Sequence, residues 1–290
     1  MSPPKRLLVF LAVYIGSNVL ASFALVLVAM AQGVGLPEIS EMLTTPGENT
    51  LAVLRIMLWI QAFLIFVLPA FLFGYLFYRN QILEYYQLRR FPALVVILLG
   101  VVIMMAGQPL VMLSYEVNSA IPLPEWMRTM ETNAAQIMSG ILDMPNTGAL
   151  IHTFILVAVL PAIGEELVFR GILQKQFGEW FRSDVAAIWV TAVLFSAVHM
   201  QFEGFLPRMV LGALLGYVYY WSRNLWVPIA GHLVNNGIPV VVLYFTGTDL
   251  TQVDTQDYPG LNVWTIVISI VVLFFASRWL QRKAITDEQN

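Results

Sequence analysis

The sequence predicts an all-α fold, a polytopic membrane bundle of about eight transmembrane helices. Hydrophobic residues make up 59% of the 290-residue chain and charged residues only 11%, whereas soluble globular domains carry about 25% charged residues. The apolar residues also gather in runs long enough to cross a bilayer, for which about 20 residues suffice. Because backbone polar groups in hydrocarbon must be satisfied within the segment, we expect these runs to be helices.

Eight apolar runs qualify as candidate spans. They cover residues 7–31, 51–78, 92–113, 149–173, 185–199, 208–221, 225–245 and 261–279. The fifth and sixth runs are short and interrupted by polar residues. We divide the chain accordingly into three parts: 1–145 with the first three helices and an outer segment, 146–250 with helices four to seven as the core, and 251–290 with the last helix and a tail.

The basic residues predict the orientation of the bundle. With eight crossings and a cytoplasmic N-terminus, most lysines and arginines outside the spans fall on the cytoplasmic side, as the positive-inside rule requires. These are Lys5, Arg6, Arg79, Arg89, Arg90, Lys175, Arg182, Arg223, Arg278, Arg282 and Lys283. The short loops look bacterial. We therefore expect a multi-pass protein of the cell (inner) membrane with both termini in the cytoplasm.

The longest stretch outside the predicted spans, residues 114–148, contains an amphipathic pattern. Apolar side chains recur near helical spacing after Pro124, at Trp126, Met130, Ile137, Met138, Ile141 and Leu142. This pattern predicts a helix that either lies at the outer membrane interface or packs on the bundle, and the sequence favours neither.

Composition also excludes several classes of function. A net charge of −3 gives no sign of the basic face of a nucleic-acid-binding protein. The absence of cysteine excludes disulfides, thiolate metal sites and a cysteine nucleophile. There is no glycine-rich phosphate loop and no dinucleotide fingerprint. Any metal must therefore be held by His, Asp, Glu or Asn side chains.

Three charged residues stand together in the fourth span. Glu165 and Glu166 are adjacent, and Arg170 follows Glu166 by four residues, which places Glu166 and Arg170 on one helix face where they can pair. Such a pair could serve only to pack helices, but it leaves Glu165 without a partner. A charged group within the bilayer is costly and usually marks function, so we interpret Glu165 as a functional residue.

Two histidines lie in later spans. His199 closes the fifth span, four residues after Phe195, and His232 lies in the seventh, four residues before Asn236. At about 1.5 Å per residue, Glu165 and these three polar residues fall at similar depths in one middle band of the membrane, so they can share one hollow. Asn235 is expected to point elsewhere because it lies off the His232 face. His152 has no polar companion in its turn and is left out of the site.

This set of side chains suits amide hydrolysis. A carboxylate and two imidazoles can activate a water either by holding a divalent metal or by direct general-base action, and an Asn amide can donate to a tetrahedral oxyanion. Gly212 and Gly216 have GxxxG spacing, which we interpret as helix packing and not chemistry.

The motifs resemble the CPBP family of intramembrane metalloproteases, the CAAX-protease and bacteriocin-processing group that includes type II CAAX prenyl endopeptidases. The family pattern is EExxxR, FxxxH and HxxxN on successive membrane helices. It is found here at Glu165–Arg170, Phe195–His199 and His232–Asn236, so the resemblance covers about residues 151–245.

The resemblance implies an intramembrane endopeptidase. In such an enzyme, Glu165 would activate the water and His199 would assist it or bind a metal. His232 and Asn236 would complete the site, and Glu166 and Arg170 would hold the neighbouring side chains in place. A zinc ion bound by Glu165, His199 and His232 is compatible with the family, as is a glutamate-activated water without metal. The expected partners are the lipid bilayer and a membrane-associated peptide or protein substrate, with no nucleic acid.

Two other functions remain open. A non-catalytic immunity or scaffold protein could use the same polar cluster to bind a peptide or partner. An ion- or proton-coupled carrier could also use an intramembrane acid, although the outer halves of the spans offer few polar residues for a continuous path.

Overall fold

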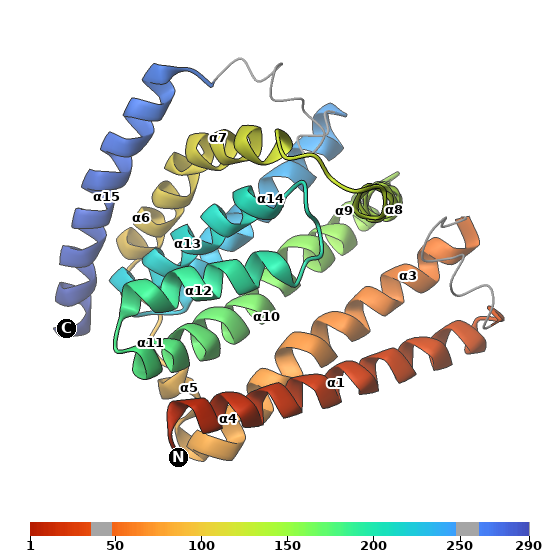
Figure 1. The fold of residues 1–290 in the computed structure, drawn as a ribbon, viewed down its shortest axis with the longest axis horizontal. Helices are drawn as coiled ribbons and strands as arrows, with labels where there is room; N and C mark the ends of the chain where they lie inside the picture. The colour runs from red at the N-terminus through yellow and green to blue at the C-terminus, as the bar shows by residue number, and fades with distance from the viewer. Residues whose placement is uncertain (36–47, 248–260, 290) are drawn as a thin grey trace.

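The computed structural model describes residues 1–35, 48–247 and 261–289, and in these residues the chain forms helices and no β-strand. This confirms the predicted fold class of a helical membrane bundle. Figure 1 shows the arrangement. The helices are α1 (Pro3–Ala31), α3 (Glu48–Gln61), α4 (Leu68–Tyr78), α5 (Ile82–Tyr85), α6 (Leu94–Ala106), α7 (Gln108–Ser119), α8 (Glu125–Ile141), α9 (Thr147–Phe154), α10 (Leu160–Val168), α11 (Lys175–Phe181), α12 (Asp184–Ala197), α13 (Phe205–Ser222), α14 (Trp226–Thr246) and α15 (Val263–Gln289).

Several of these helices continue one another. The π-helical segment η1 (Ala62–Val67) joins α3 to α4. Two further π-helical segments, η3 (Ile155–Val159) and η4 (Phe169–Gln174), join α9, α10 and α11 into one rod. Such π-helical segments are rare in proteins, and those that do occur are often found at functional sites. Here they flank α10, the helix that carries both glutamates.

Each of the eight predicted apolar runs coincides with helix, but the number of full crossings is approximate. Six helical stretches in the described part of the chain are long and apolar enough to cross a membrane: Pro3–Ala31, Val53–Tyr85, Leu94–Ser119, Thr147–Phe181, Trp226–Thr246 and Val263–Thr286. The fifth predicted span, α12, has 14 residues, which is about 21 Å of helix and shorter than the ~30 Å hydrocarbon core. The sixth, α13, has 18 residues and is not among the six.

The helices form a layered bundle. In Figure 1 the pair α1 and α3 lies along one border and α15 along the other, with α10, α12, α13, α14 and α6 between them. Both ends of the chain lie on the same side of the bundle in this view, which agrees with an even number of crossings. That this side faces the cytoplasm stays a prediction.

The amphipathic segment forms α8, and α8 packs on the bundle. Arg55 of α3 donates to the carbonyl oxygens of Gly140 (3.5 Å) and Asp143 (3.0 Å) at its C-terminal end. The Trp126 ring at its other end packs edge-on against Phe202, with 5.5 Å between centroids. The structure therefore shows α8 packed on the bundle, and its position at the outer membrane interface stays a prediction.

The GxxxG pair in α13 allows a close approach of neighbouring helices, as predicted. A Cβ atom on Gly212 would lie 3.1 Å from Cδ1 of Phe195, and one on Gly216 would lie 2.9 Å from Oε1 of Gln174 and 3.0 Å from Cγ2 of Ile188. The backbone carbonyls exposed by this approach are also used, because Gly212 O and Gly216 O accept hydrogen bonds from Arg170 (2.8 Å) and Gln174 (3.0 Å).

We expect Gly216→Val to destabilise the protein by about 1–3 kcal/mol, because the added methyl groups overpack the contact with Gln174 and Ile188. The measurement is the thermal unfolding midpoint in detergent. Gly16→Val is the matched control, since no atom lies within 4 Å of a Cβ built on Gly16. Equal midpoints for the two variants would contradict the close-approach role of Gly216.

Candidate active site

The candidate residues of three helices meet at one cavity of about 930 Å³. Its wall includes Glu165 of α10, Phe195 of α12, His199 just after α12, and His232 and Asn236 of α14. Residues of α1, α3, η1, α7, α8, η3 and α13 and of the turn after α12 also line it. Ligand pockets typically have volumes of about 300–1,000 Å³, so the cavity has the size to hold a short peptide segment.

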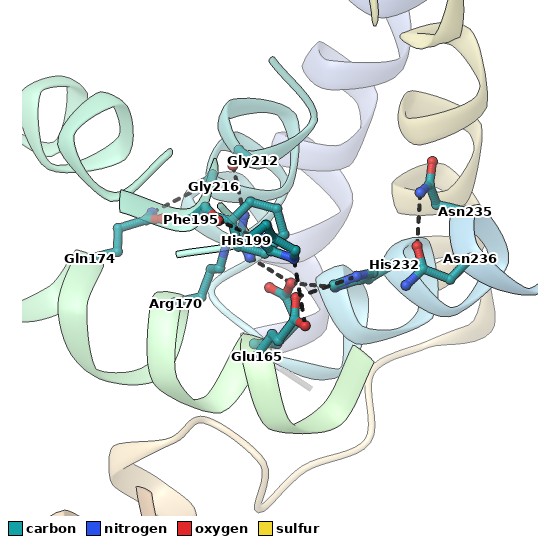
Figure 2. Close-up of polar contacts among 11 residues, drawn as sticks. Glu165, Arg170, Gln174, Phe195, His199, Gly212, Gly216, His232, Asn235 and Asn236 are labelled. Carbon is teal, nitrogen blue, oxygen red and sulfur yellow. Dashed lines mark hydrogen bonds and ion pairs between the residues drawn. The ribbon is translucent and has the colours of Figure 1, made fainter. Parts of the chain in front are cut away.

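Glu165 lies between the two imidazoles. One carboxylate oxygen, Oε1, is 4.0 Å from Nε2 of His199, and the other, Oε2, is 3.9 Å from Nε2 of His232. Figure 2 shows the three side chains pointing toward one another. These distances exceed a direct hydrogen bond, but they are short enough for one small group to contact both partners of each pair. The sequence-based expectation that the three residues share a hollow is met by this geometry.

The hydrogen bond made by Nδ1 determines the tautomer of each histidine. Nδ1 of His199 lies 2.7 Å from the carbonyl oxygen of Phe195, and Nδ1 of His232 lies 2.9 Å from Oε1 of Glu166. Carbonyl and carboxylate oxygens only accept hydrogen bonds, so Nδ1 carries the proton in both rings. Nε2 of each neutral imidazole then keeps a lone pair. The lone pairs of the two histidines are directed at Glu165 or at a ligand beside it.

A buried ion pair orients His232. Arg170 Nη1 donates to Oε1 of Glu166 at 2.6 Å, and Nη2 donates to the carbonyl oxygen of Gly212 at 2.8 Å. The side chains of Glu166 and Arg170 are fully buried. The i,i+4 pairing predicted from the sequence is therefore confirmed. Glu166 also accepts a hydrogen bond from His232, and the sequence did not predict this contact.

Phe195 packs at the centre of the three motifs. The guanidinium carbon of Arg170 lies 4.8 Å from its ring centroid, a cation–π contact. The rings of His199 and His232 lie 5.2 and 6.0 Å from the same centroid, in edge-on geometry. Phe195 thus contacts Arg170 of the ion pair and both imidazoles.

His199 lies in a turn and not in the helix that the sequence predicted for it, because α12 ends at Ala197 and Met200 has a positive φ of 52°. Polar side chains from other helices hold the turn. Asn118 of α7 donates to Phe202 O and accepts from Leu206 N, both at 2.8 Å. Glu131 of α8 accepts from the backbone N–H groups of Phe202 and Glu203. Sequence reasoning missed both residues. Neither residue stands out in the sequence, because each has polar neighbours one helical turn away: Ser114 and Tyr115 for Asn118, and Arg128 for Glu131.

The expectation that Asn235 points away from the site is wrong. Asn235 lines the cavity, and its Nδ2 donates to Oδ1 of Asn236 at 3.0 Å. Neighbouring residues on a helix do differ by about 100° in direction, but here the two asparagine side chains flank one broad cavity wall. Asn236 in turn donates from Nδ2 to the carbonyl oxygen of Val157 at 3.3 Å. His152 does not line the cavity and accepts a hydrogen bond from Trp59 Nε1 at 3.0 Å, which agrees with leaving it out of the site.

The donor set fits a zinc ion in chemical type. Two neutral imidazoles and a carboxylate are the ligands of a known class of catalytic zinc site, and their other ring nitrogens are held by carboxylate or carbonyl oxygens, as zinc-bound histidines usually are. The spacing is wider than a closed site, since tetrahedral ligands about 2.0–2.1 Å from a metal lie about 3.4 Å apart. Among the described residues, no three His, Asp or Glu side chains are close enough to hold a metal as they stand.

The segment that carries the three motifs is similar in sequence to known proteins. Residues 147–238 match the family model of type II CAAX prenyl endopeptidase Rce1-like proteins. The Staphylococcus aureus (strain USA300) membrane-embedded CAAX protease MroQ is 30% identical over 121 residues, which are 37% of this chain and 48% of that protein. Two Bacillus subtilis (strain 168) proteins are also similar. The uncharacterized protein YpbD is 30% identical over 92 residues (30% of this chain, 44% of that protein), and the putative membrane peptidase YdiL is 27% identical over 103 residues (36% and 41%).

These matches cover less than half the length of each relative, and no solved structure matches the chain. The helices before residue 147 fall outside the family model, although α1, α3 and α8 contribute to the wall of the cavity. The predicted resemblance is nevertheless confirmed: residues 147–238 of this multi-pass membrane protein match the Rce1-like family model and are similar to a membrane-embedded CAAX protease.

Proposed function

We propose that this protein is an intramembrane endopeptidase that hydrolyses a peptide bond of a membrane-associated peptide or protein. The observation that carries the proposal is the convergence of two imidazole Nε2 atoms on the carboxylate of Glu165, at 4.0 and 3.9 Å, in the wall of a cavity within the helix bundle. A packing cluster would bring such groups into direct hydrogen bonds. Here the spacing leaves room for a reacting water beside the carboxylate.

The chemistry then follows from the side chains. Glu165 accepts a proton from water as the water oxygen adds to the scissile carbonyl carbon. The carbonyl oxygen becomes an oxyanion, which the Nδ2 amide of Asn236 stabilises. Glu165 returns the proton to the leaving nitrogen as the C–N bond breaks, and the products are a carboxylic acid and an amine. His199 and His232 flank the water through their Nε2 lone pairs.

Glu166 and Arg170 support this chemistry without contacting the substrate. Glu166 accepts from His232 Nδ1 and so fixes the tautomer in which Nε2 faces Glu165. Arg170 balances the charge of Glu166 and is itself tied to α13 through Gly212 O. A zinc ion, where present, would be held by Glu165, His199 and His232 and would polarise the water toward its hydroxide form.

The substrate is proposed to be a peptide segment that reaches the site through the membrane phase. Most of the cavity wall is apolar, and its polar residues include Glu165, His199, His232 and Asn236. A wall of this kind accommodates hydrophobic side chains and presents hydrogen-bonding groups at the scissile bond. We further propose a location in the cell membrane with both termini cytoplasmic, on the basis of the positive-inside distribution.

A non-catalytic binding protein is the second candidate, because the same cavity could hold a peptide without cutting it. It requires only shape and polar complementarity. It gives no reason for both histidines to be held as the tautomer whose lone pair faces one carboxylate.

We expect Glu165→Gln to lower kcat for peptide cleavage by about 10²–10⁴-fold, because an amide cannot accept the water proton. The measurement is product formation by purified protein in detergent, with membrane-extract peptides as substrates and mass-spectrometric detection. Glu116→Gln on α7 is the matched control, because Glu116 is exposed and does not line the cavity. Cleavage by Glu165→Gln at the wild-type rate would contradict the proposed function. Peptide binding without any cleavage by the wild type would favour the non-catalytic candidate.

The zinc form of the mechanism predicts that the purified wild type retains about one zinc per chain and that His199→Gln loses it together with activity, because three protein ligands are needed for a catalytic zinc site. Metal content is measured by elemental analysis before and after dialysis against a chelator. His152→Gln, outside the cavity, is the control and should keep the metal. Full activity in metal-free wild type would replace the zinc form of the mechanism with direct activation by Glu165.

A further inference from the structure

Three side-chain amides form a continuous chain that leads from α7 to Asn236. Gln108, the first residue of α7, donates from Nε2 to the carbonyl oxygen of Met104 (3.2 Å) and to Oδ1 of Asn235 (3.0 Å). Asn235 donates from Nδ2 to Oδ1 of Asn236 (3.0 Å). Asn236 donates from Nδ2 to the carbonyl oxygen of Val157 (3.3 Å). Figure 2 shows the link between the two asparagines.

Backbone carbonyls determine the direction of this chain at both ends. Met104 O and Val157 O can only accept hydrogen bonds, so the NH₂ groups of Gln108 and Asn236 must face them. Pro161, four residues later, has no N–H with which to make an α-helical hydrogen bond to the carbonyl of Val157. With both ends fixed, Asn235 has one consistent orientation, with Oδ1 toward Gln108 and Nδ2 toward Asn236.

Reversal of one amide would place two acceptors or two donors against each other. Gln108, Asn235 and Asn236 are each partly buried, and an unmatched polar group away from water costs about 1–3 kcal/mol. Linked amides also polarise one another, which strengthens the ordered arrangement. The chain therefore holds the Asn236 amide in a single orientation.

We propose that Gln108 and Asn235 are positioning residues that keep Nδ2 of Asn236 directed into the cavity as the oxyanion donor. The oxygen of Asn236 is occupied by Asn235, and one of its two N–H groups is used by Val157 O. The second N–H of Asn236 is left for the substrate. This inference rests on the proposed peptidase function and deepens it, since Gln108 belongs to a helix outside residues 147–238.

The first test is Gln108→Met, which keeps the length of the side chain but cannot donate. We expect kcat for peptide cleavage to fall at least about 10-fold with KM changed less than about twofold, because loss of a full oxyanion donor costs about 10²–10³-fold in kcat and a disordered donor costs part of that. Gln174→Met is the matched control. Gln174 is a buried glutamine that donates to Gly216 O and does not line the cavity. We expect it to lower the thermal midpoint and to leave kcat unchanged.

A double-mutant cycle separates positioning from general stability. In the Asn236→Ala background the donor is already absent, so Gln108→Met should lower kcat less than about twofold further. Asn235→Asp covers the case in which Gln108→Met does not fold. Its two acceptor oxygens would turn the Asn236 amide around, and we expect at least about a 10-fold loss of kcat despite the nearly identical shape.

Three outcomes would overturn the inference. One is wild-type kcat in Gln108→Met, or in Asn235→Asp where Gln108→Met does not fold. Another is an equal loss from Gln108→Met with and without Asn236. In both of these cases the wild type still cleaves, so the proposed function stands. Absence of cleavage by the wild type would remove the proposed function and the inference together.

Discussion

The buried contact between Arg170 and Glu166 is the interaction on which the arrangement of the site depends. Both side chains are fully buried, and separating two such charges leaves one of them unpaired, at a cost of about 3–5 kcal/mol. The pair reaches α13 through Gly212 O and α14 through His232 Nδ1. It also contacts α12 through the ring of Phe195. One ion pair therefore joins the three helices that carry, or lie next to, the candidate residues.

The close approach of α13 makes this contact geometry attainable. A Cβ atom on Gly212 would lie 3.1 Å from Cδ1 of Phe195, so a larger residue there would press against α12 next to the carbonyl that accepts from Arg170. The small-residue spacing, interpreted from the sequence as packing alone, thus also supplies a hydrogen-bond acceptor to the centre of the bundle. The same residue therefore allows close helix packing and, through its backbone carbonyl, binds the arginine that supports the candidate site.

Local patterns in the sequence predicted the features that depend on one helix at a time. Apolar runs predicted the position of the long membrane helices, and i,i+4 spacing predicted the Glu166–Arg170 pair, because both follow from helical geometry alone. Contacts between distant segments could not be predicted in this way. The bonds from Gln108 to Asn235 and from Asn118 and Glu131 to the His199 turn join residues 71–127 positions apart. The π-turns that flank α10 also shift the phase of the helix, so faces cannot be extrapolated across them.

Hydrogen bonding distinguishes the supporting residues from Glu165, the residue proposed to accept the proton from water. Glu166, Arg170, Asn118 and Glu131 each make direct hydrogen bonds to protein groups. Glu165 forms no hydrogen bond in the described part of the chain, and its contacts with the two Nε2 atoms lie at 3.9–4.0 Å. Keeping a carboxylate buried without a direct donor is unfavourable for stability. A protein retains such an arrangement where the group must be ready for an exchangeable ligand, and this supports hydrolysis as the role of Glu165 in preference to packing.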